Sequence, residues 1–364
     1  MDPKLTQNGA IRPGRGARSN ADGRFERQSH ELVDDGWGAL DEPPPPLRTT
    51  VTRDATRSII ARNQSPDISF DRSINPYRGC EHGCIYCFAR PTHAYLGLSP
   101  GLDFESRLFV KPEAAKLLEA ELRKPAYRCR VMAMGTNTDP YQPIEREWQV
   151  TRNVIKVLSA FHHPLSMVTK SHLITRDIDI LAPMAERRLF FACISVTTLD
   201  RRLARKMEPR AATPERRLEA IAALAAAGIP VMAMAAPIIP GLTDHEIEAI
   251  ADAAAAHGAR RLGYVLLRMP LEIKDLFREW LETEVPDRAK RVISLMRDMH
   301  NGKDYDSKWF ERARGHGPFA QLIEERVKKA RARFGLDTPL PPLDTRQFSP
   351  PPLPPKAGDQ LTLF

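Results

Sequence analysis

Short apolar runs alternate with helical patterns through the middle of this 364-residue chain, and this alternation constrains its fold most. Apolar runs occupy residues 131–134, 165–168, 189–196, 231–239 and 264–267, and a less apolar strand is expected at 73–78. Helical patterns occupy residues 113–123, 149–161, 177–187, 214–227 and 244–257. Strands that alternate with helices favour a parallel sheet with right-handed crossovers. The expected fold is therefore α/β, as a barrel or an open partial barrel of six β/α units.

Four segments are expected along the chain. Residues 1–68 are polar and contain a run of four prolines, which predicts a mostly irregular N-terminal extension. Residues 69–285 hold the alternating pattern and form the expected core domain. Two more helices, at about 286–300 and 318–334, predict a C-terminal helical cap over 286–336. Residues 337–364 are rich in proline, which predicts a semi-extended tail.

Composition excludes several protein classes. Apolar residues make up 42% of the chain, which excludes global disorder. Five cysteines are too few and too unevenly spaced for a disulfide scaffold, and they favour a reducing, cytoplasmic location. Residues 220–243 carry no charge, but Gly228 and Pro230 interrupt them. A membrane-spanning helix needs about 20 continuous apolar residues, so this stretch indicates a helix, a turn and a buried strand.

Three of the five cysteines fall within eight residues, directly after the first expected strand. Cys80, Cys84 and Cys87 have the spacing C-x3-C-x2-C. Thiolates bind soft metal centres, and three of them leave one iron of a four-iron cluster open to an outside ligand. The alternative is a structural zinc site with His82 as the fourth ligand, although such sites usually take pairs of ligands from two separated elements.

This cysteine spacing, with the aromatic Tyr86 before the last cysteine and a β/α pattern around it, resembles the radical S-adenosylmethionine (SAM) superfamily over residues 70–270. Within it the chain is most similar to the spore photoproduct lyase-like branch, often labelled DNA repair photolyase. The segments Ser73–Cys80 and Gly135–Gln142 resemble an uncharacterised bacterial subfamily of that branch.

The resemblance implies a radical SAM enzyme with a partial barrel fold. Cys80, Cys84 and Cys87 would hold a [4Fe–4S] cluster, and the methionyl group of SAM would chelate the fourth iron. One electron, from a donor such as flavodoxin or ferredoxin, would release a 5′-deoxyadenosyl radical that abstracts a hydrogen atom from the substrate. The protein's task would be to orient the reactants and exclude competing reactions.

The resemblance also assigns the SAM-binding residues, all near the carboxyl ends of strands, where barrel chemistry is sited. Tyr86 would pack near the adenine, and Gly135, Thr136 and Asn137 would meet the methionyl group. Lys170, Ser195 and Ala236 match positions that contact the nucleotide. Capping or loop hydrogen bonding is the alternative role for each. Asp139 and Glu145 are candidate supporting groups, and a helix start is an equally good interpretation of Glu145.

One departure from the lyase concerns the hydrogen atom that is returned to the product radical. The lyase carries a cysteine for this step at the end of its second strand, whereas residues 135–139 here contain none. Cys129 lies six residues earlier, about 20 Å along a strand at ~3.3 Å per residue. Cys193 shares a strand face with Ser195, although a buried, inert role is favoured for it. Reversal of a thymine dimer by the lyase's own route is therefore not expected.

Two further features concern partners. Basic residues cluster at 201–210 and 326–333, where they could contact phosphates or simply form solvated helix faces. Residues Gln360, Leu361, Thr362, Leu363 and Phe364 resemble the pentapeptide with which bacterial DNA polymerases and repair proteins bind the DNA sliding clamp. Apolar anchors on a polar tail suit that role, although the tail could instead dock on its own domain.

The leading hypothesis is a radical SAM enzyme that acts on a nucleic acid, in DNA repair or base modification. The first alternative is a radical SAM enzyme that modifies a protein, a peptide or a small metabolite. The second is an iron–sulfur protein that associates with DNA or the clamp without turnover.

Overall fold

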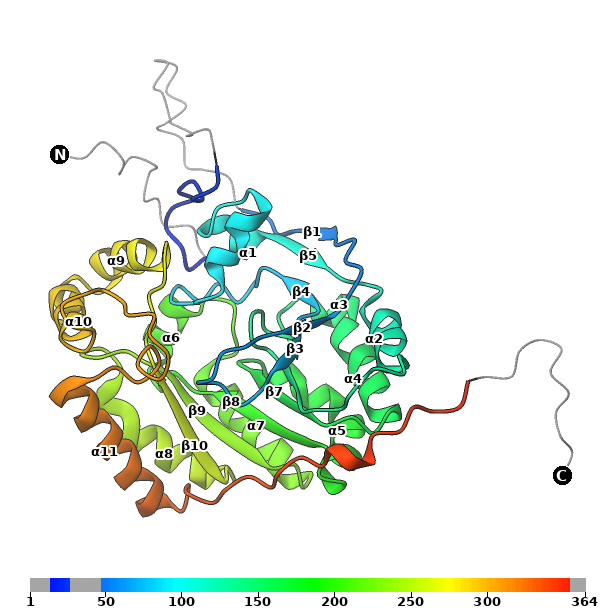
Figure 1. The fold of residues 1–364 in the computed structure, drawn as a ribbon. Helices are drawn as coiled ribbons and strands as arrows, with labels where there is room; N and C mark the ends of the chain where they lie inside the picture. Colours follow the sequence, from blue (N-terminus) through cyan, green and yellow to red (C-terminus); the bar gives the residue numbers. More distant parts are fainter. Residues whose placement is uncertain (1–13, 27–46, 354–364) are drawn as a thin grey trace, which may run out of the picture.

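The computed structural model describes residues 14–26 and 47–353, which are built around a curved sheet of seven strands (Figure 1). The strand order is β10-β9-β8-β7-β6-β3-β2, and every neighbouring pair is parallel except β2 and β3. The strands are β2 (Ile60–Arg62), β3 (Arg72–Ile74), β6 (Met132–Met134), β7 (Leu165–Thr169), β8 (Phe190–Ser195), β9 (Val231–Ile238) and β10 (Arg261–Leu266).

The two edge strands of this sheet, β10 and β2, do not pair with each other, so the barrel is partial. The six parallel strands correspond to the six that the sequence predicts, which confirms the α/β partial barrel. Strand β10 begins at Arg261, three residues earlier than expected. Its first residues include Arg261 and Gly263, which interrupt the apolar signal although the backbone is already paired with β9.

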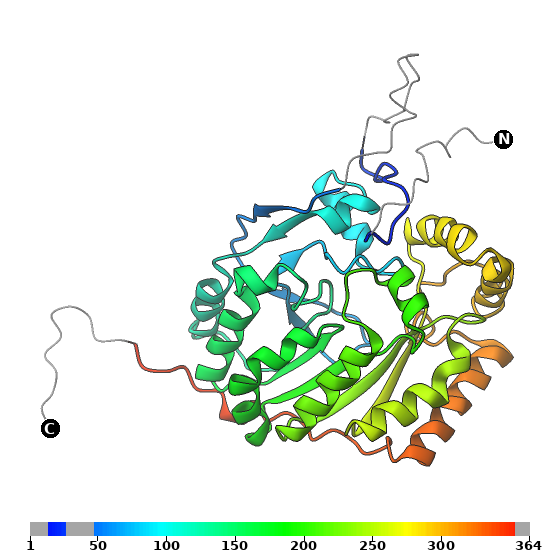
Figure 2. The ribbon, with the colours of Figure 1, turned by 180° about the vertical axis from the view of Figure 1, so that it is seen from behind.

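Helices cover the outer face of the sheet (Figure 2). Those that the sequence predicts for the core domain are α2 (Ala114–Leu122), α4 (Val150–Ala160), α5 (Ile178–Glu186), α7 (Pro214–Ala226) and α8 (Ile247–Ala256). Alternation along β9 explains the packing, because Val231, Ala233 and Ala235 are buried while Met232 and Met234 are half-exposed. The first set packs in the core with the helices, and the second faces the inner side of the sheet.

The remaining helices lie at the carboxyl edge of the sheet or form the cap. They are α1 (Leu102–Ser106), α3 (Glu145–Trp148), α6 (Arg201–Met207), α9 (Ile273–Glu284), α10 (Pro286–Asp298) and α11 (Gly317–Phe334). The predicted cap helices correspond to α10 and α11. In the part of the chain that the structure describes, no helix is both long and apolar enough to cross a bilayer.

A second sheet of three strands corrects two expectations. It consists of β1 (Thr50–Arg53), β5 (Arg107–Val110) and β4 (Tyr77–Arg78), in the order β1-β5-β4. The single strand expected at 73–78 is divided into β3 and β4, since Pro76 lacks the N–H that a continuous ladder needs. Strands β1 and β2 also lie within the predicted irregular extension. Both are short and largely exposed, so they carry no apolar pattern.

The proline-rich segment after α11, predicted to be a semi-extended tail, contacts the domain as far as Pro351, whose carbonyl accepts from Arg123 at 2.8 Å. Leu336 and Asp337 pair with β10. Farther on, Phe348 packs against Tyr127 and Phe161, and the backbone N–H of Ser349 donates to the carbonyl of Phe161. The contacts of Phe348 thus hold against the domain a segment whose composition alone predicts a tether.

Candidate cofactor site around the cysteine loop

The three clustered cysteines lie on a loop, residues 80–87, at the carboxyl edge of the main sheet. Cys80 and Cys84 are buried, Cys87 is half-buried, and all three are free thiols. Gly83 bends the loop with a φ of +66°, and a Cβ there would lie 2.6 Å from a carboxylate oxygen of Glu105. The loop therefore needs glycine at this point to keep its three sulfurs on one stretch of chain.

The chemistry of the three thiols fits an iron–sulfur cluster. Burial raises the pKa of both Cys80 and Cys84, and neighbouring acidic groups raise these values further. A thiolate in such surroundings needs a cationic partner, which a cluster iron supplies. Because each thiolate of a cluster binds a different iron, the three sulfurs need not converge on one point.

The structural-zinc alternative finds no support in this geometry. Across residues 14–26 and 47–353, no three His, Cys, Asp or Glu side chains are arranged to hold a single metal ion. His82, the candidate fourth ligand, places its Nδ1 atom 3.4 Å from Asp139. Its interaction is thus with a carboxylate of the next loop.

The segment after β6 holds the cysteine loop from one side. The side chain of Gln142 accepts from the backbone N–H of Glu81 at 2.8 Å and donates to the carbonyl of Gly79 at 3.3 Å. Burial alone would raise the pKa of Asp139, but His82 and hydrogen bonds from Thr169 and Lys170 hold it at about 2. Asp139 therefore remains ionised and joins the cysteine loop to the end of β7.

A buried ion pair holds the loop from the other side. Arg90 donates to the carbonyls of Gly83 and Cys84 at 2.9 Å and to Glu105 at 2.5 Å, and both side chains of the pair are fully buried. Glu105 also accepts from the backbone N–H groups of Gly16 and Ala17 at 2.9 and 2.8 Å. An N-terminal segment, residues 14–26, thus lies against the cysteine loop without forming a helix or strand.

Several of the predicted SAM-binding residues come together beside the loop. The ammonium of Lys170 lies 5.7 Å from the centre of the Tyr86 ring. The Tyr86 hydroxyl donates to Glu208, and Thr197 donates to the same carboxylate at 2.7 Å. Thr197 also lies 3.4 Å from the carbonyl of Ala236. A chain of polar contacts therefore links the cysteine loop to the ends of β7, β8 and β9.

The other predicted residues are placed less directly. The backbone N–H of Asn137 donates to Asn75 at 3.1 Å, which ties the end of β6 to the end of β3. Thr136 is half-exposed in the same loop, and Ser195 is buried at the end of β8. Glu145 accepts from the N–H groups of Thr151 and Arg152 in the first turn of α4, so the helix-start interpretation applies to it. Gln360, Leu361, Leu363 and Phe364 lie outside the described residues.

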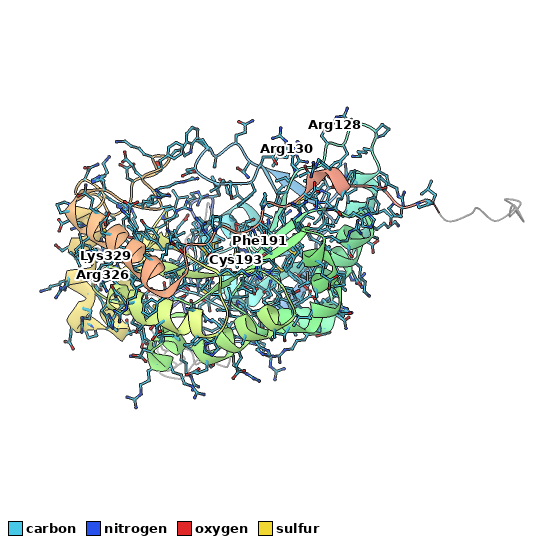
Figure 3. All side chains as sticks on the ribbon, turned by 90° about the horizontal axis from the view of Figure 1, so that it is seen from below. Arg128, Arg130, Phe191, Cys193, Arg326 and Lys329 are labelled. Atoms are coloured by element: carbon cyan, nitrogen blue, oxygen red, sulfur yellow. The ribbon has the colours of Figure 1, made fainter. Side chains whose placement is uncertain are left out.

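Cys193 lies on β8, in the middle of the molecule (Figure 3). In the parallel register it pairs with Val168 of β7 and Met232 of β9. It is 3% exposed, and burial raises its pKa to about 12, so its thiol remains protonated. Cys129 is half-exposed before β6, and burial raises its pKa to about 11. Neither thiol lies on the cysteine loop.

An exposed aromatic side chain directly follows the third cysteine. Phe88 is 46% exposed, and the guanidinium of Arg268 lies 4.9 Å from its ring centre. Arg268 follows β10 and donates weakly to Tyr305 at 3.4 Å, while its buried Nε has no hydrogen-bond partner. An exposed ring and a cation with one unpartnered nitrogen thus lie together directly after the cysteine loop.

Sequence reasoning missed several residues that shape this site. They are Arg90, Glu105, Thr197, Glu208, Arg217 and Arg268. Glu208 and Arg217 form a fully buried ion pair from two different segments. Only their contacts reveal them, because a single charged residue in a helical segment looks like a surface residue. Gln142 could have been identified from the sequence, because it lies in the segment that carries the family resemblance.

Gly135 offers a test of the close packing at the end of β6. A Cβ there would lie 1.9 Å from the carbonyl oxygen of Val168, and φ is +84°. Gly135→Ala is expected to lower the free energy of unfolding by about 2–4 kcal/mol, since left-handed backbone costs alanine about 1–2 kcal/mol and overpacking adds a similar amount. Urea denaturation of the apoprotein measures this loss.

The matched control is Gly228→Ala, because Gly228 has a φ of +77° but nothing within 4 Å of the added Cβ. It should lose only the backbone part, about 1–2 kcal/mol. Equal losses for the two variants would show that Val168 and the end of β6 tolerate the extra atom.

Comparison with known proteins adds sequence and fold relationships. The family model described as the radical SAM superfamily matches residues 74–254. Uncharacterised proteins of Mycobacterium bovis and Mycobacterium tuberculosis are 37% identical over 242 residues, which cover 65% of this chain and 71% of theirs. A protein of Methanocaldococcus jannaschii is 30% identical over 173 residues, which cover 48% of this chain and 62% of its own.

Solved structures of spore photoproduct lyase show a similar fold. The structure complexed with dinucleoside spore photoproduct superposes with a TM-score of 0.53 at 15% identity, and 78% of each chain is covered. A variant of the same lyase gives the same score and coverage at 16% identity. At this identity the likeness concerns the fold alone. The family match and the mycobacterial relatives establish that the chain belongs to the radical SAM superfamily and is a radical SAM enzyme whose cofactors are a [4Fe–4S] cluster and SAM.

Proposed function

We propose that this enzyme modifies a nucleic acid, in DNA repair or base modification. The observation that carries the proposal is the pair formed by Phe88 and Arg268 beside the cysteine loop. Exposed aromatic rings stack on bases, and arginine attracts phosphate and stacks as a cation. The Phe88 ring is 46% exposed and directly follows a proposed cluster ligand, so it is open to a stacking partner beside the cysteine loop.

Cys80, Cys84 and Cys87 are proposed to bind one iron each through their sulfurs. When bound, the cluster and SAM would supply the radical chemistry that removes a hydrogen atom from the substrate. Around them, Tyr86 is proposed to pack near the adenine and Lys170, whose ammonium lies over that ring, to meet the polar part of the nucleotide. The carboxylate of Glu208 accepts a hydrogen bond from the Tyr86 hydroxyl and so orients the ring.

Five further residues complete the proposed SAM site. Ser195 would contact the nucleotide from the end of β8, and Ala236 would contact it through its backbone at the end of β9. Gly135, Thr136 and Asn137 would meet the methionyl group, because their loop is tied to the cysteine-loop side of the sheet through Asn75.

The surroundings of the loop suit a reaction that must exclude water and other competitors. The Arg90–Glu105 pair and the N-terminal segment cover the loop on one face, and Gln142 and Asp139 hold it on the other. The substrate is proposed to approach beside Phe88 and Arg268, where the exposed ring directly follows the loop.

Relatives of known structure support a nucleic-acid substrate. Spore photoproduct lyase has been solved with dinucleoside spore photoproduct and, in one variant, with SAM as well. The absence of a cysteine from residues 135–139 argues against an identical reaction, since the lyase's hydrogen-return group is missing at that place. A different modification of DNA or RNA is therefore favoured over reversal of the same lesion.

Two partners belong to the proposal. A small electron-transfer protein such as flavodoxin or ferredoxin would reduce the cluster. Gln360, Leu361, Leu363 and Phe364 would bind the DNA sliding clamp, because they combine a polar register residue with apolar anchors. Tethering to the clamp would raise the local concentration of the enzyme on DNA.

The proposal is tested by following deuterium from the substrate. The enzyme is reconstituted with iron and sulfide under anaerobic conditions, reduced with dithionite and given SAM together with deuterated DNA or RNA. Deuterium should appear in the 5′-deoxyadenosine that forms, as judged by mass spectrometry. Formation of unlabelled 5′-deoxyadenosine with every nucleic acid, and of labelled product with a deuterated peptide pool, would move the enzyme to the alternative substrate class.

Phe88→Ala is the matched variant for this experiment. It should reduce deuterium transfer at least about fivefold, because loss of one stacked base costs about 1–3 kcal/mol, yet leave the iron content unchanged. Tyr95→Ala is the control, since Tyr95 is also exposed and stacked with an arginine but contacts Phe25 of the N-terminal segment. Equal activity of the two variants would remove Phe88 from the substrate site.

A further inference from the structure

A cavity of about 480 Å³ opens where the partial barrel fails to close. It is lined on one side by Arg261 and Gly263 of β10 and on the other by Ser69, in the loop between β2 and β3. Near it, Arg312 and Asp67 form an ion pair at 2.5 Å that joins the cap to the β2–β3 loop. We call this space, between the two edges of the sheet, the seam cavity.

The charge of the seam cavity is strongly positive. Four of its lining side chains are cations, namely Arg261, Arg314, Lys328 and Arg331, and one is a carboxylate, Glu324. The carboxylate of Glu324 lies 3.9 Å from Arg314 and also raises the pKa of Arg331, although less than burial lowers it. Burial, and then the charges of Arg261 and Arg314, lower the pKa of Arg331, so these cations are close enough to repel one another. An anion bound among them would relieve that repulsion.

The helix α11 presents only part of its basic sequence to this space. Glu324, Lys328 and Arg331 are spaced four and three residues apart and therefore share one face. Arg326 instead binds Glu248 of α8 at 2.6 Å. Figure 3 labels Arg326 and Lys329 on α11, apart from Phe191 and Cys193 in the middle of the molecule. The basic residues 326–333 of α11 are thus divided between the face that lines the seam cavity and faces that lie on the surface.

The floor of the cavity leads toward the cofactor site. It includes Met232 and Met234, which lie on the inner side of β9. Met234 pairs with Ser195 of β8, and Ala236 lies two residues farther along β9, about 7 Å at ~3.3 Å per residue. A ligand held in the cavity therefore lies along the same inner side of the sheet as the proposed SAM-binding residues.

We propose that the seam cavity binds a backbone phosphate of the nucleic-acid substrate, next to the nucleotide that reaches the cysteine loop. This inference rests on the proposed function for its class of ligand. Arginine and lysine are the usual phosphate-binding side chains, and the apolar floor with Tyr264 on the rim suits the adjoining sugar or base. The cavity would position the strand, and Phe88 and Arg268 would hold the nucleotide.

The experiment measures binding of a fluorescein-labelled single-stranded 12-mer DNA to the full-length reconstituted enzyme by anisotropy. The double variant Arg314→Glu/Lys328→Glu should weaken binding at least about tenfold, which is ~1.4 kcal/mol. The control Lys329→Glu/Arg333→Glu makes the same change in net charge on the surface side and should stay within about twofold. Arg331 is left unchanged in both pairs, because its Nε donates a hydrogen bond to the carbonyl of Leu262 at 2.7 Å.

Salt dependence sharpens the result. Arg314→Ala/Lys328→Ala should lower the slope of log affinity against log salt by about 0.7, since the cavity is proposed to hold one phosphate and each phosphate contact of a single strand contributes about 0.7. Equal weakening by the two charge-reversal pairs would overturn the inference, because general surface charge would then explain binding. Competition by AMP or inorganic phosphate as effective as that by unlabelled 12-mer would also overturn it, in favour of a free phosphate ligand.

The two proposals fail in distinguishable ways. In one outcome the parent enzyme transfers deuterium from a nucleic acid that the variant Arg314→Glu/Lys328→Glu binds as tightly as the parent does. In that outcome only the cavity inference is wrong. If the parent enzyme neither binds nucleic acid nor exchanges deuterium with it, the proposed function fails and the cavity inference falls with it.

Discussion

Replacing Cys84 with alanine is expected to leave an enzyme that, after reconstitution, retains less than about a tenth of the iron of the parent chain. Cys84 is one of three free thiols on the cysteine loop, and an iron without its thiolate would face a buried, largely apolar surface. The variant should form no detectable 5′-deoxyadenosine from SAM and dithionite. Iron analysis, visible absorption and product analysis on the same sample measure the two effects.

Cys193→Ala and Cys129→Ala are the controls for this prediction. Both remove a free thiol, and Cys193 is as buried as Cys84, but neither lies on the loop of residues 80–87. Both should keep the full iron content. A Cys84→Ala enzyme that still binds four irons would show that the cluster has other ligands, and a Cys193→Ala enzyme without iron would place that thiol among them.

Replacing Glu105 with alanine is expected to lower the free energy of unfolding by about 3–5 kcal/mol, the usual loss when one partner of a buried ion pair is removed. Arg90 would be left as an uncompensated charge, fully buried under the cysteine loop. The N–H groups of Gly16 and Ala17 would also lose their acceptor. Denaturant unfolding measures the loss, and earlier proteolysis within residues 14–26 should accompany it.

Glu272→Ala is the matched control, because Glu272 also binds the N-terminal segment, through Arg24 at 2.8 Å. Both side chains of that pair retain contact with water, so its loss should cost at most about 1 kcal/mol. If both variants unfold at the same denaturant concentration, the Arg90–Glu105 pair does not stabilise the loop more than a surface contact does.

The main sheet and its outer helices were predictable because their signals are periodic. Every second residue of β9 is buried against helices, and α7 begins at Pro214 behind Thr213, whose hydroxyl caps the helix by accepting from Arg216. Strands β1 and β2 were not predictable, since they are short, polar and exposed. Their pairing depends on partners, β5 and β3, that arrive from elsewhere in the chain.

The candidate site divides in the same way. The spacing of three cysteines carries the resemblance to the radical SAM superfamily, and the family match confirms that membership. These three cysteines, at residues 80–87, are the proposed ligands of its cluster. Glu105, Glu208 and Arg268 carry no such signal. A carboxylate or guanidinium becomes part of a site only when folding buries it beside a particular partner.

The tertiary structure alone decided which residues surround the cysteine loop and where the proline-rich segment contacts the domain. It divided the basic sequence of α11 between a cavity and the surface, because a helix turns successive residues to different sides. It also docked residues 338–351, where Phe348 meets Tyr127 and Phe161. The spacing of the cysteines indicated the chemistry. Contacts between distant segments decided which groups surround the candidate site, what charge they carry and how strongly they stabilise it. These properties depend on which groups share a low-dielectric interior.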